Sequence, residues 1–296
     1  KIINIKAKTV SKKDLFSSLG RIVSKECIIA TNTSSFSVTE LATSMVHPER
    51  FIGLHFFYHA AKNRLVEIIP GKKTSADTLQ ATRLFTVLAG KDAIDCTDTY
   101  GFAVNRFFVP WLNESVKLLQ EAVATKAEID AVCMKVFGIG MGPFALMNAT
   151  GVPIAYHSEK TLEVFGKLYE VAPLLKAQAE AAKPWEIESA AADTIETAKE
   201  KLISDRMLGV VFYVCAQILE EKVSSAIHLN RGAKIGLRWR KGPVDLMIAA
   251  GEAEVTRLVT QMTELYRMPL PSSIGKNFWV MESVTIKKNN SVAVIT

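Results

Sequence analysis

The second half of this chain repeats itself at a fixed distance of 100 residues. An ungapped shift by that distance places Gly142-Pro143 on Gly242-Pro243. It also aligns Arg106 with Arg206, Leu119 with Leu219, Glu121 with Glu221, Leu146-Met147 with Leu246-Met247, and Gly151 with Gly251. A Gly-Pro pair alone only breaks one helix before another, but this many identities at one period indicate two copies of one unit. We predict a duplicated all-α region.

The first hundred residues follow a different pattern, in which strand-type and helix-type segments alternate. We predict strands at 27–30, 51–57, 65–69 and 93–96, and helices at 11–24, 37–44 and about 75–88. Ser11 is the expected N-cap of the first helix. This alternation indicates an α/β layer with a partly parallel sheet.

Four segments follow from these patterns. Residues 1–100 are expected to be this α/β domain, and 101–183 the first helical repeat. Residues 184–281 comprise a charged, Ala-rich helical connector up to Lys201 and then the second repeat. Residues 282–296 switch to β-type residues around Lys288-Asn289-Asn290, which predicts a hairpin.

Composition narrows the class of protein. The net charge is +6, but the Lys and Arg residues are interleaved with acids and form no aromatic-rich basic stripe, so no nucleic-acid partner is expected. A mild positive excess suits an anionic small ligand. The four Cys residues are scattered without metal-ligand spacing, so we expect no metal and a reducing, cytoplasmic location. No signal peptide and no apolar run of membrane-spanning length are found.

Four polar residues stand at the ends of apolar runs or inside them. They are Ser34, His55, Glu67 and Asn105. An ionisable residue within an otherwise apolar strand usually has a specific partner or ligand. An acyl-transfer nucleophile at Ser34 is disfavoured, because the serine lacks the glycines of a nucleophile elbow.

The segments that carry these residues resemble the L-3-hydroxyacyl-CoA dehydrogenase family. The matching motifs are Thr31-Asn32-Thr33-Ser34-Ser35, Gly53-Leu54-His55-Phe56-Phe57, Leu65-Val66-Glu67-Ile68-Ile69, Gly101-Phe102-Ala103-Val104-Asn105-Arg106 and Met141-Gly142-Pro143-Phe144. The resemblance covers roughly residues 8–280. It implies that the α/β part is a partial Rossmann-type domain, with residues 1–100 the C-terminal part of a dinucleotide-binding domain. The duplicated helical half is similar to that of multifunctional fatty-acid β-oxidation proteins, and the tail resembles the start of an enoyl-CoA hydratase segment. A dehydrogenase–hydratase fusion cut at both ends is thereby implied.

The resemblance assigns a role to each of the four residues. His55 is the implied catalytic base and Glu67 its partner, while Ser34 and Asn105 contact the substrate oxygen. The chemistry agrees, because oxidising a secondary alcohol needs a base that titrates near neutrality, and imidazole does. A carboxylate on the other ring nitrogen fixes the tautomer, and neutral donors stabilise the developing carbonyl oxygen. NAD is the implied cofactor.

The resemblance also implies binding residues. Lys12, Asn32 and Ser34 are the expected contacts to NAD. Lys62 and Arg64 are the expected contacts to the coenzyme A phosphates, by their place in the sequence and their charge. The family's glycine-rich GxGxxG turn is not found, and Gly138 to Gly142 is a helix break rather than that fingerprint. We therefore expect weak NAD binding by these residues alone.

The implied function is oxidation of (S)-3-hydroxyacyl-CoA to 3-ketoacyl-CoA in fatty-acid β-oxidation. The alternative is a non-enzymatic acyl-CoA-binding or assembly module without the dinucleotide site. A weaker third option is a dehydrogenase that acts on a 3-hydroxy acid without coenzyme A. We expect the two helical repeats to pair within the chain, giving a monomer or a weak oligomer, since a covalent second copy supplies the partner surface.

Overall fold

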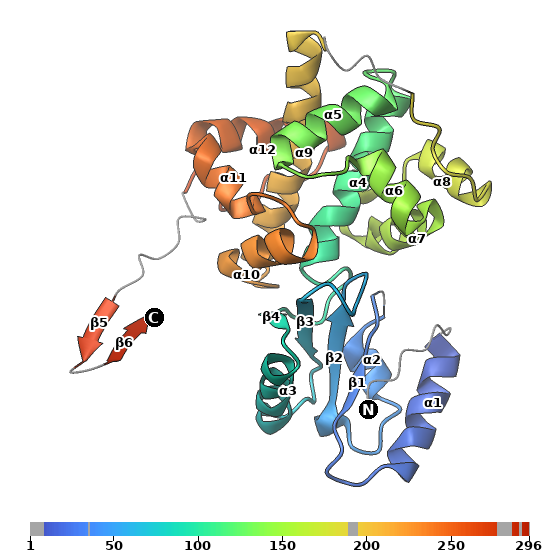
Figure 1. Ribbon diagram of the computed structural model, residues 1–296, viewed down its shortest axis with the longest axis vertical. Helices are drawn as coiled ribbons and strands as arrows, with labels where there is room; N and C mark the ends of the chain where they lie inside the picture. Colours follow the sequence, from blue (N-terminus) through green and yellow to red (C-terminus); the bar gives the residue numbers. More distant parts are fainter. Residues whose placement is uncertain (1–8, 35, 189–194, 277–285, 290–291, 296) are drawn as a thin grey trace.

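The computed structural model describes residues 9–34, 36–188, 195–276, 286–289 and 292–295. An α/β part comes first and an all-helical part follows, as the sequence predicts (Figure 1). The α/β part contains α1 (Thr9–Ile22), β1 (Ile29–Thr31), α2 (Val38–Ala42), the short 3₁₀ helix η1 (Pro48–Arg50), β2 (Phe51–Phe56), β3 (Leu65–Pro70), α3 (Ala76–Leu88) and β4 (Asp92–Asp95).

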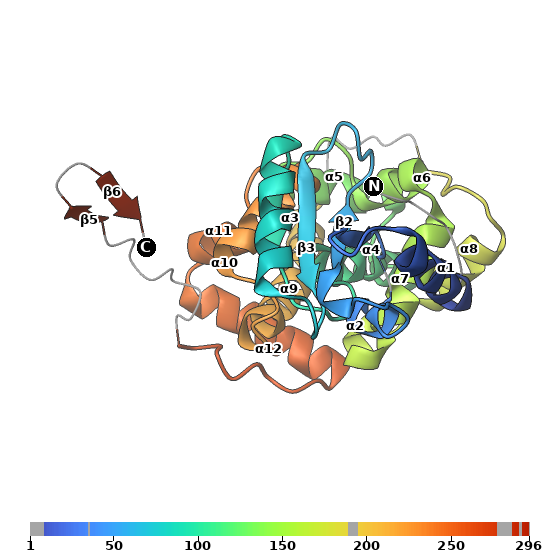
Figure 2. The ribbon, with the colours of Figure 1, turned by 90° about the horizontal axis from the view of Figure 1, so that it is seen from below.

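The four strands form one sheet in the order β1-β2-β3-β4. β1 pairs with β2 in parallel and β3 pairs with β4 in parallel, whereas β2 and β3 are antiparallel. The sheet is therefore parallel only in part, as expected. Helix α3 lies on one side of it, and α1 and α2 lie on the other (Figure 2).

The two faces of the sheet have different cores, because successive side chains of a strand point to opposite faces. On the α3 side, Ile52 and Leu54 of β2 pack with Val66 and Ile68 of β3. On the other face, the alternate residues of these strands join the large core that extends through the helical part. His55 alternates with Leu54 and Glu67 with Val66, so both polar side chains belong to the face that meets the helical part.

The helical part begins with α4 (Val104–Gln120), α5 (Lys126–Phe137), α6 (Pro143–Thr150), α7 (Val152–Leu162), the 3₁₀ helices η2 (Glu163–Phe165) and η3 (Lys167–Tyr169), and α8 (Pro173–Glu180). It continues with α9 (Thr197–Glu220), α10 (Ala226–Arg231), the π-helical η5 (Gly232–Gly236), α11 (Pro243–Ala250) and α12 (Glu252–Tyr266). Helices α4 and α9 pack against each other at the centre (Figure 1).

Local signals explain where these helices begin and end. Thr125 and Glu128 form a capping box at the start of α5, and Gly138 ends that helix in the left-handed conformation at φ 63°. Gly142 then caps α6, whose first residue is a proline. The prediction that the Gly138–Gly142 stretch is a helix break is confirmed.

Two local predictions need correction. Helix α1 begins at Thr9, so Ser11 lies inside it and is not its N-cap. The connector is not helical over 184–188, because Pro184 supplies no amide donor and the Trp185 amide and carbonyl bond to the Asn148 side chain instead. Residues 189–194 of the connector lie outside the described residues.

The tail forms the expected antiparallel hairpin of β5 (Ile286–Asn289) and β6 (Val292–Ile295). Lys288 and Asn289 pair with Ala293 and Val292, so they belong to a strand and not to the turn. Residues 290–291, between the strands, and the predicted start of the segment at 282–285 lie outside the described residues.

Helix α9 is long and apolar enough to cross a membrane, judged by length and composition alone. However, 67% of its apolar window is buried inside the structure, which is the environment of a core helix in a globular domain. All four cysteines are free, and three of them are buried.

Candidate active site

His55 and Glu67 meet across the antiparallel pair of strands β2 and β3. The register places His55 directly opposite Glu67, so both side chains stand on the same face. His55 Nδ1 lies 2.6 Å from Glu67 Oε2. The His55 residue is 4% exposed and Glu67 is fully buried. The expectation that Glu67 comes within hydrogen-bond reach of His55 is confirmed.

Ser34 reaches the other side of the same imidazole. It follows β1, which runs parallel to β2, so the loop after Thr31 emerges at the end of the sheet where His55 stands. The Ser34 hydroxyl lies 3.1 Å from His55 Nε2. Ser34 itself is exposed, so the Nε2 side of the ring is the side that faces outward.

The second carboxylate oxygen of Glu67 is held by backbone amides at the start of α4. The N–H groups of Ala103 and Val104 donate to Glu67 Oε1 over 3.1 and 2.9 Å. Amides at a helix N-terminus have no partner within the helix, and the helix dipole there favours a negative charge. These contacts favour an ionised Glu67 carboxylate in a buried place.

An ionised Glu67 determines the proton arrangement of His55. A carboxylate can only accept hydrogen bonds, so Nδ1 of His55 must be the donor. In neutral imidazole this leaves a lone pair on Nε2, which accepts a hydrogen bond from Ser34 or from a bound hydroxyl group. The pair can thus take up a proton at Nε2 while the carboxylate stabilises the resulting imidazolium.

Neighbouring residues that the sequence reasoning missed fix this arrangement. The rings of Phe57 and Phe102 pack against the imidazole of His55 at centroid distances of 4.8 and 5.7 Å. Asp98 accepts hydrogen bonds from the Ser37 hydroxyl and from the amides of Val38 and Thr39, over 2.7 to 2.8 Å. Asp98 therefore ties the loop after Ser34 to the segment that leads into α4. The available signal was its position three residues before the Gly101–Arg106 motif.

The other predicted contacts are placed less directly. Asn105 is in the first turn of α4, one residue after the Val104 amide that binds Glu67. That the Asn105 side chain points toward the substrate stays a prediction. The Asn32 side chain accepts a hydrogen bond from the Phe56 amide over 3.0 Å, which holds the end of β1 against β2. Asn32 thus makes a structural contact, in addition to the contact with the cofactor that is predicted for it.

Lys12 is buried on α1, with its ammonium 5.2 Å from the ring centre of Phe36. Burial lowers the pKa of Lys12 below its usual value. Within the part of the chain that the structure describes, no carboxylate forms an ion pair with it. A buried ammonium of this kind suits an anionic ligand.

Lys62 and Arg64 lie in the exposed loop between β2 and β3, at the end of the sheet that carries His55. The guanidinium of Arg64 already forms an ion pair with Asp92, with Nε 3.0 Å from Oδ2. No contact joins either side chain to His55, Glu67 or Ser34 among the described residues. Their role toward coenzyme A stays a prediction.

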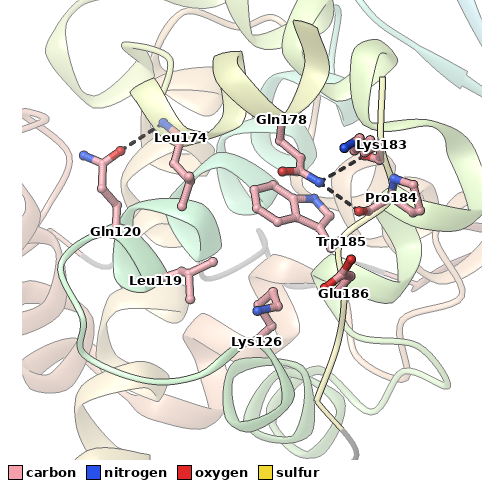
Figure 3. Close-up of a pocket in the computed structure, with 9 residues that line it drawn as sticks. All are labelled: Leu119, Gln120, Lys126, Leu174, Gln178, Lys183, Pro184, Trp185 and Glu186. Carbon is pink, nitrogen blue, oxygen red and sulfur yellow. Dashed lines mark hydrogen bonds between the residues drawn. The ribbon is translucent and has the colours of Figure 1, made fainter. Parts of the chain in front are cut away.

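A separate hollow of about 630 Å³ lies in the helical part, away from these residues. It is lined by Leu119, Gln120, Lys126, Leu174, Gln178, Lys183, Pro184, Trp185 and Glu186 (Figure 3). Gln120 accepts from the Leu174 amide, and Gln178 donates to the carbonyls of Lys183 and Pro184. The two glutamines at its wall therefore serve to fix the backbone, and the hollow contains none of the predicted site residues.

A buried histidine–carboxylate pair thus lies at the end of a partly parallel sheet, an arrangement that is suited to acid–base chemistry. Comparison with known proteins identifies the family. The family described as "3-hydroxyacyl-CoA dehydrogenase, NAD binding domain" matches residues 4–99, and "3-hydroxyacyl-CoA dehydrogenase, C-terminal domain" matches residues 101–192. The chain belongs to the 3-hydroxyacyl-CoA dehydrogenase family. It has a Rossmann-like NAD-binding domain followed by a helical C-terminal domain.

Individual proteins that are similar in sequence to this chain are dehydrogenases of the same family. The chain is 39% identical to a mitochondrial hydroxyacyl-coenzyme A dehydrogenase of Sus scrofa over 48% of this chain and 45% of that protein. It is 38% identical to a 3-hydroxybutyryl-CoA dehydrogenase of Clostridioides difficile over 48% of this chain and 51% of that protein. The chain thus spans about half the length of these curated relatives.

A solved structure shares the fold over most of the chain. It is a 3-hydroxybutyryl-CoA dehydrogenase from Escherichia coli K12, with a TM-score of 0.79. The match covers 90% of this chain and 78% of the other, at 20% identity. At that identity the likeness concerns the fold, and it extends into the second half of the helical part.

Proposed function

We propose that this chain carries the acid–base site of an NAD-dependent oxidation of (S)-3-hydroxyacyl-CoA to 3-ketoacyl-CoA, as in fatty-acid β-oxidation. The observation that supports it most is the His55 imidazole, with Nδ1 on the Glu67 carboxylate and Nε2 beside the Ser34 hydroxyl. This geometry gives a proton acceptor whose reactive nitrogen faces outward. Membership of the family supports the choice of substrate class.

In this proposal the substrate hydroxyl binds between Ser34 and His55 Nε2. His55 takes the hydroxyl proton as the C–O bond gains double-bond character, and Glu67 stabilises the imidazolium that forms. Ser34 and Asn105 donate hydrogen bonds to the oxygen as it becomes a carbonyl. In the reverse direction His55 returns the proton. NAD, when bound, supplies the acceptor for the hydride that leaves the carbon.

The described residues fit the cofactor at its reactive end. Ser34 is exposed beside the base, and the buried Lys12 ammonium can face an anionic group of the dinucleotide. Asn32 and Ser34 are the further proposed contacts, because both are in the loop after β1. NAD affinity is therefore a direct test of how much of the cofactor site these residues supply.

The test is calorimetric titration of the chain with NADH and, separately, with acetoacetyl-CoA. Turnover of (S)-3-hydroxybutyryl-CoA with NAD is then measured for the unchanged chain and for His55→Gln. Binding of both ligands, with turnover that His55→Gln abolishes, supports the proposal. Binding of the CoA ester without NADH binding or turnover supports the alternative, a non-enzymatic acyl-CoA-binding or assembly module.

We infer further that the helical part is a duplicated unit whose copies pair within the chain. Its support is a reciprocal pair of contacts whose residues correspond to each other at a shift of 100 residues. Arg106 donates to Glu221 over 2.7 Å, and Arg206 donates to Glu121 over 2.8 Å. Such an exchange of equivalent contacts is the mark of a two-fold interface. The proposed segments are 101–183 for the first copy and 184–281 for the linker and second copy.

Two finer proposals concern the hairpin of β5 and β6 and the cysteines. The hairpin of β5 and β6 is consistent with the first strands of a hydratase-like segment in a multifunctional protein. Mass determination of the protein from its natural source would test this, and a mass equal to that of the dehydrogenase part alone would refute it. Four free cysteines agree with a reducing compartment such as the cytoplasm.

A further inference from the structure

The open edge of strand β4 is covered by the second half of the helical part. The Thr97 amide donates to the Val223 carbonyl over 2.9 Å, and the Asp95 amide donates to Nδ1 of His228 over 3.2 Å. The Ser224 hydroxyl donates to the Asp95 carbonyl over 2.7 Å. Residues 223–236, here called the docking segment, thus take the hydrogen-bonding place that a further strand would have.

Within the docking segment, Gly232 allows an approach that a side chain would prevent. A Cβ added there would lie 2.5 Å from Cγ2 of Val104 and 3.3 Å from Cδ1 of Ile94. Val104 is in the first turn of α4, where a β-branched side chain has essentially one rotamer and cannot turn away. A side chain at position 232 must therefore displace the start of α4 or the docking segment itself.

The equivalent segment of the first half has no such adaptation. At a shift of 100 residues, Val132 corresponds to Gly232 and Val136 to Gly236. Helix α5 continues through both valines as a regular α-helix, whereas the docking segment changes to the π-helical η5 over Gly232–Gly236. A Cβ at Gly236 would meet Cδ2 of Leu65 on β3 at 2.3 Å. At these two positions glycine occurs only in the copy whose segment packs on β3 and β4.

The elements that the docking segment touches are those that hold Glu67. Ile94 of β4 is the register partner of Glu67 on β3. Val104 supplies one of the two amides on Glu67 Oε1. We propose that the docking segment is a positioning element for the catalytic carboxylate of Glu67. In this proposal Gly232 sets the distance between the docking segment and the start of α4. This inference rests on the proposed function, because that function is what makes Glu67 a catalytic residue. The contacts themselves can be measured without any turnover.

The test uses hydrogen exchange of the Ala103 and Val104 amides, followed by NMR on the whole chain. Both amides stand at a helix start and donate to the Glu67 carboxylate, so their exchange reports the Glu67 contact. The Ala103 amide also contacts the Cys96 sulfur, so the exchange of Val104 is the more direct measure. We expect Gly232→Ala to accelerate their exchange by about ten-fold or more, while amides in the middle of α4 keep their rates. Turnover should fall in kcat with KM unchanged, as for a positioning defect.

Two variants make the outcome decisive. Gly140→Ala is the matched control, because a Cβ at Gly140 meets nothing within 4 Å, and it should leave exchange and turnover unchanged. Val104→Ala removes the clashing Cγ2 atom, so the double variant with Gly232→Ala should recover slow exchange. Equal exchange in Gly232→Ala and the unchanged chain, or no recovery in the double variant, would overturn the inference.

Ser224→Ala provides a milder test if Gly232→Ala does not fold. It removes only the hydroxyl on the Asp95 carbonyl. A smaller acceleration at Ala103 and Val104 is expected, and unchanged exchange there would also overturn the inference. If the exchange results are as expected but the unchanged chain oxidises no 3-hydroxyacyl-CoA, the proposed function fails and the positioning contact stands.

Discussion

At the scale of single residues, Glu67 is held at both carboxylate oxygens, one by His55 and one by two backbone amides. Glu67→Gln keeps the size of the side chain but replaces one acceptor oxygen with an NH₂ donor. That donor must face either the Nδ1–H group or the two amides, so the imidazole loses its fixed tautomer. We expect kcat/KM for (S)-3-hydroxybutyryl-CoA to fall about 10²- to 10⁴-fold, measured by NADH formation.

The control for this substitution is Glu264→Gln, an exposed glutamate near the end of α12. The same chemical change there should leave kcat/KM within about two-fold of the original. A Glu67→Gln variant that retains full turnover would show that Glu67 has only a packing role.

At the scale of elements, α10 docks on β4 through a titratable group, His228. Burial lowers the pKa of His228 below its usual value, and the charges of Arg231 and Arg83 act in the same direction, while Asp95 opposes them. The bond from the Asp95 amide requires an unprotonated Nδ1. Below about pH 6.5 the unfolded chain binds a proton that the folded chain excludes. The contact therefore contributes to the free energy of unfolding above that pH, and this contribution is lost as the pH falls.

This predicts a difference between the original chain and His228→Asn, whose amide oxygen can accept the same bond without titrating. Free energies of unfolding from urea titrations at pH 7.5 and 5.5 would measure it. The original chain should lose more stability between these two pH values than His228→Asn does. Equal losses would show that His228 is not the titrating contact.

At the scale of the whole molecule, the two halves of the helical part are joined by buried charges. The guanidinium of Arg206 is buried and contacts the buried carboxylate of Glu114 as well as Glu121. Arg206→Met leaves the Glu114 carboxylate buried without its cation, which costs about 3–5 kcal/mol in the free energy of unfolding. Arg257→Met at a more exposed ion pair should cost at most about 1 kcal/mol. Urea unfolding of both variants compares them.

The same packing of α4 on α9 predicts the assembly state. Because each helix is covered by the other within one chain, we expect a monomer of 32.5 kDa in sedimentation equilibrium at micromolar concentration. A stable dimer would indicate that the helical part retains a further self-complementary face. Arg206→Met should then be examined for a concentration-dependent mass, which would link the ion pair to the choice between the two states.

Much of the α/β part could be predicted from local sequence. The apolar runs around Leu54 and Val66 identified two strands, because both faces of these strands are buried in the sheet. Helix α3 does not follow its apolar residues, since its buried side chains are threonines and its large apolar side chains near the C-terminal end are exposed. The Gly142-Pro143 stretch predicted a helix break for an equally local reason. The polar residues Ser34, His55 and Glu67 could be singled out because each interrupts or ends an apolar run.

The sequence by itself thus determined the kinds of element, their order, the hundred-residue period and the candidate residues. Only the tertiary structure decided that β3 runs antiparallel to β2, which puts Glu67 opposite His55, and that the amides of Ala103 and Val104 complete the carboxylate site. It also decided that Gly232 meets Val104, 128 residues earlier in the chain. Periodicity encodes burial within one element, whereas pairing direction and helix docking depend on edges and side chains that are distant in sequence.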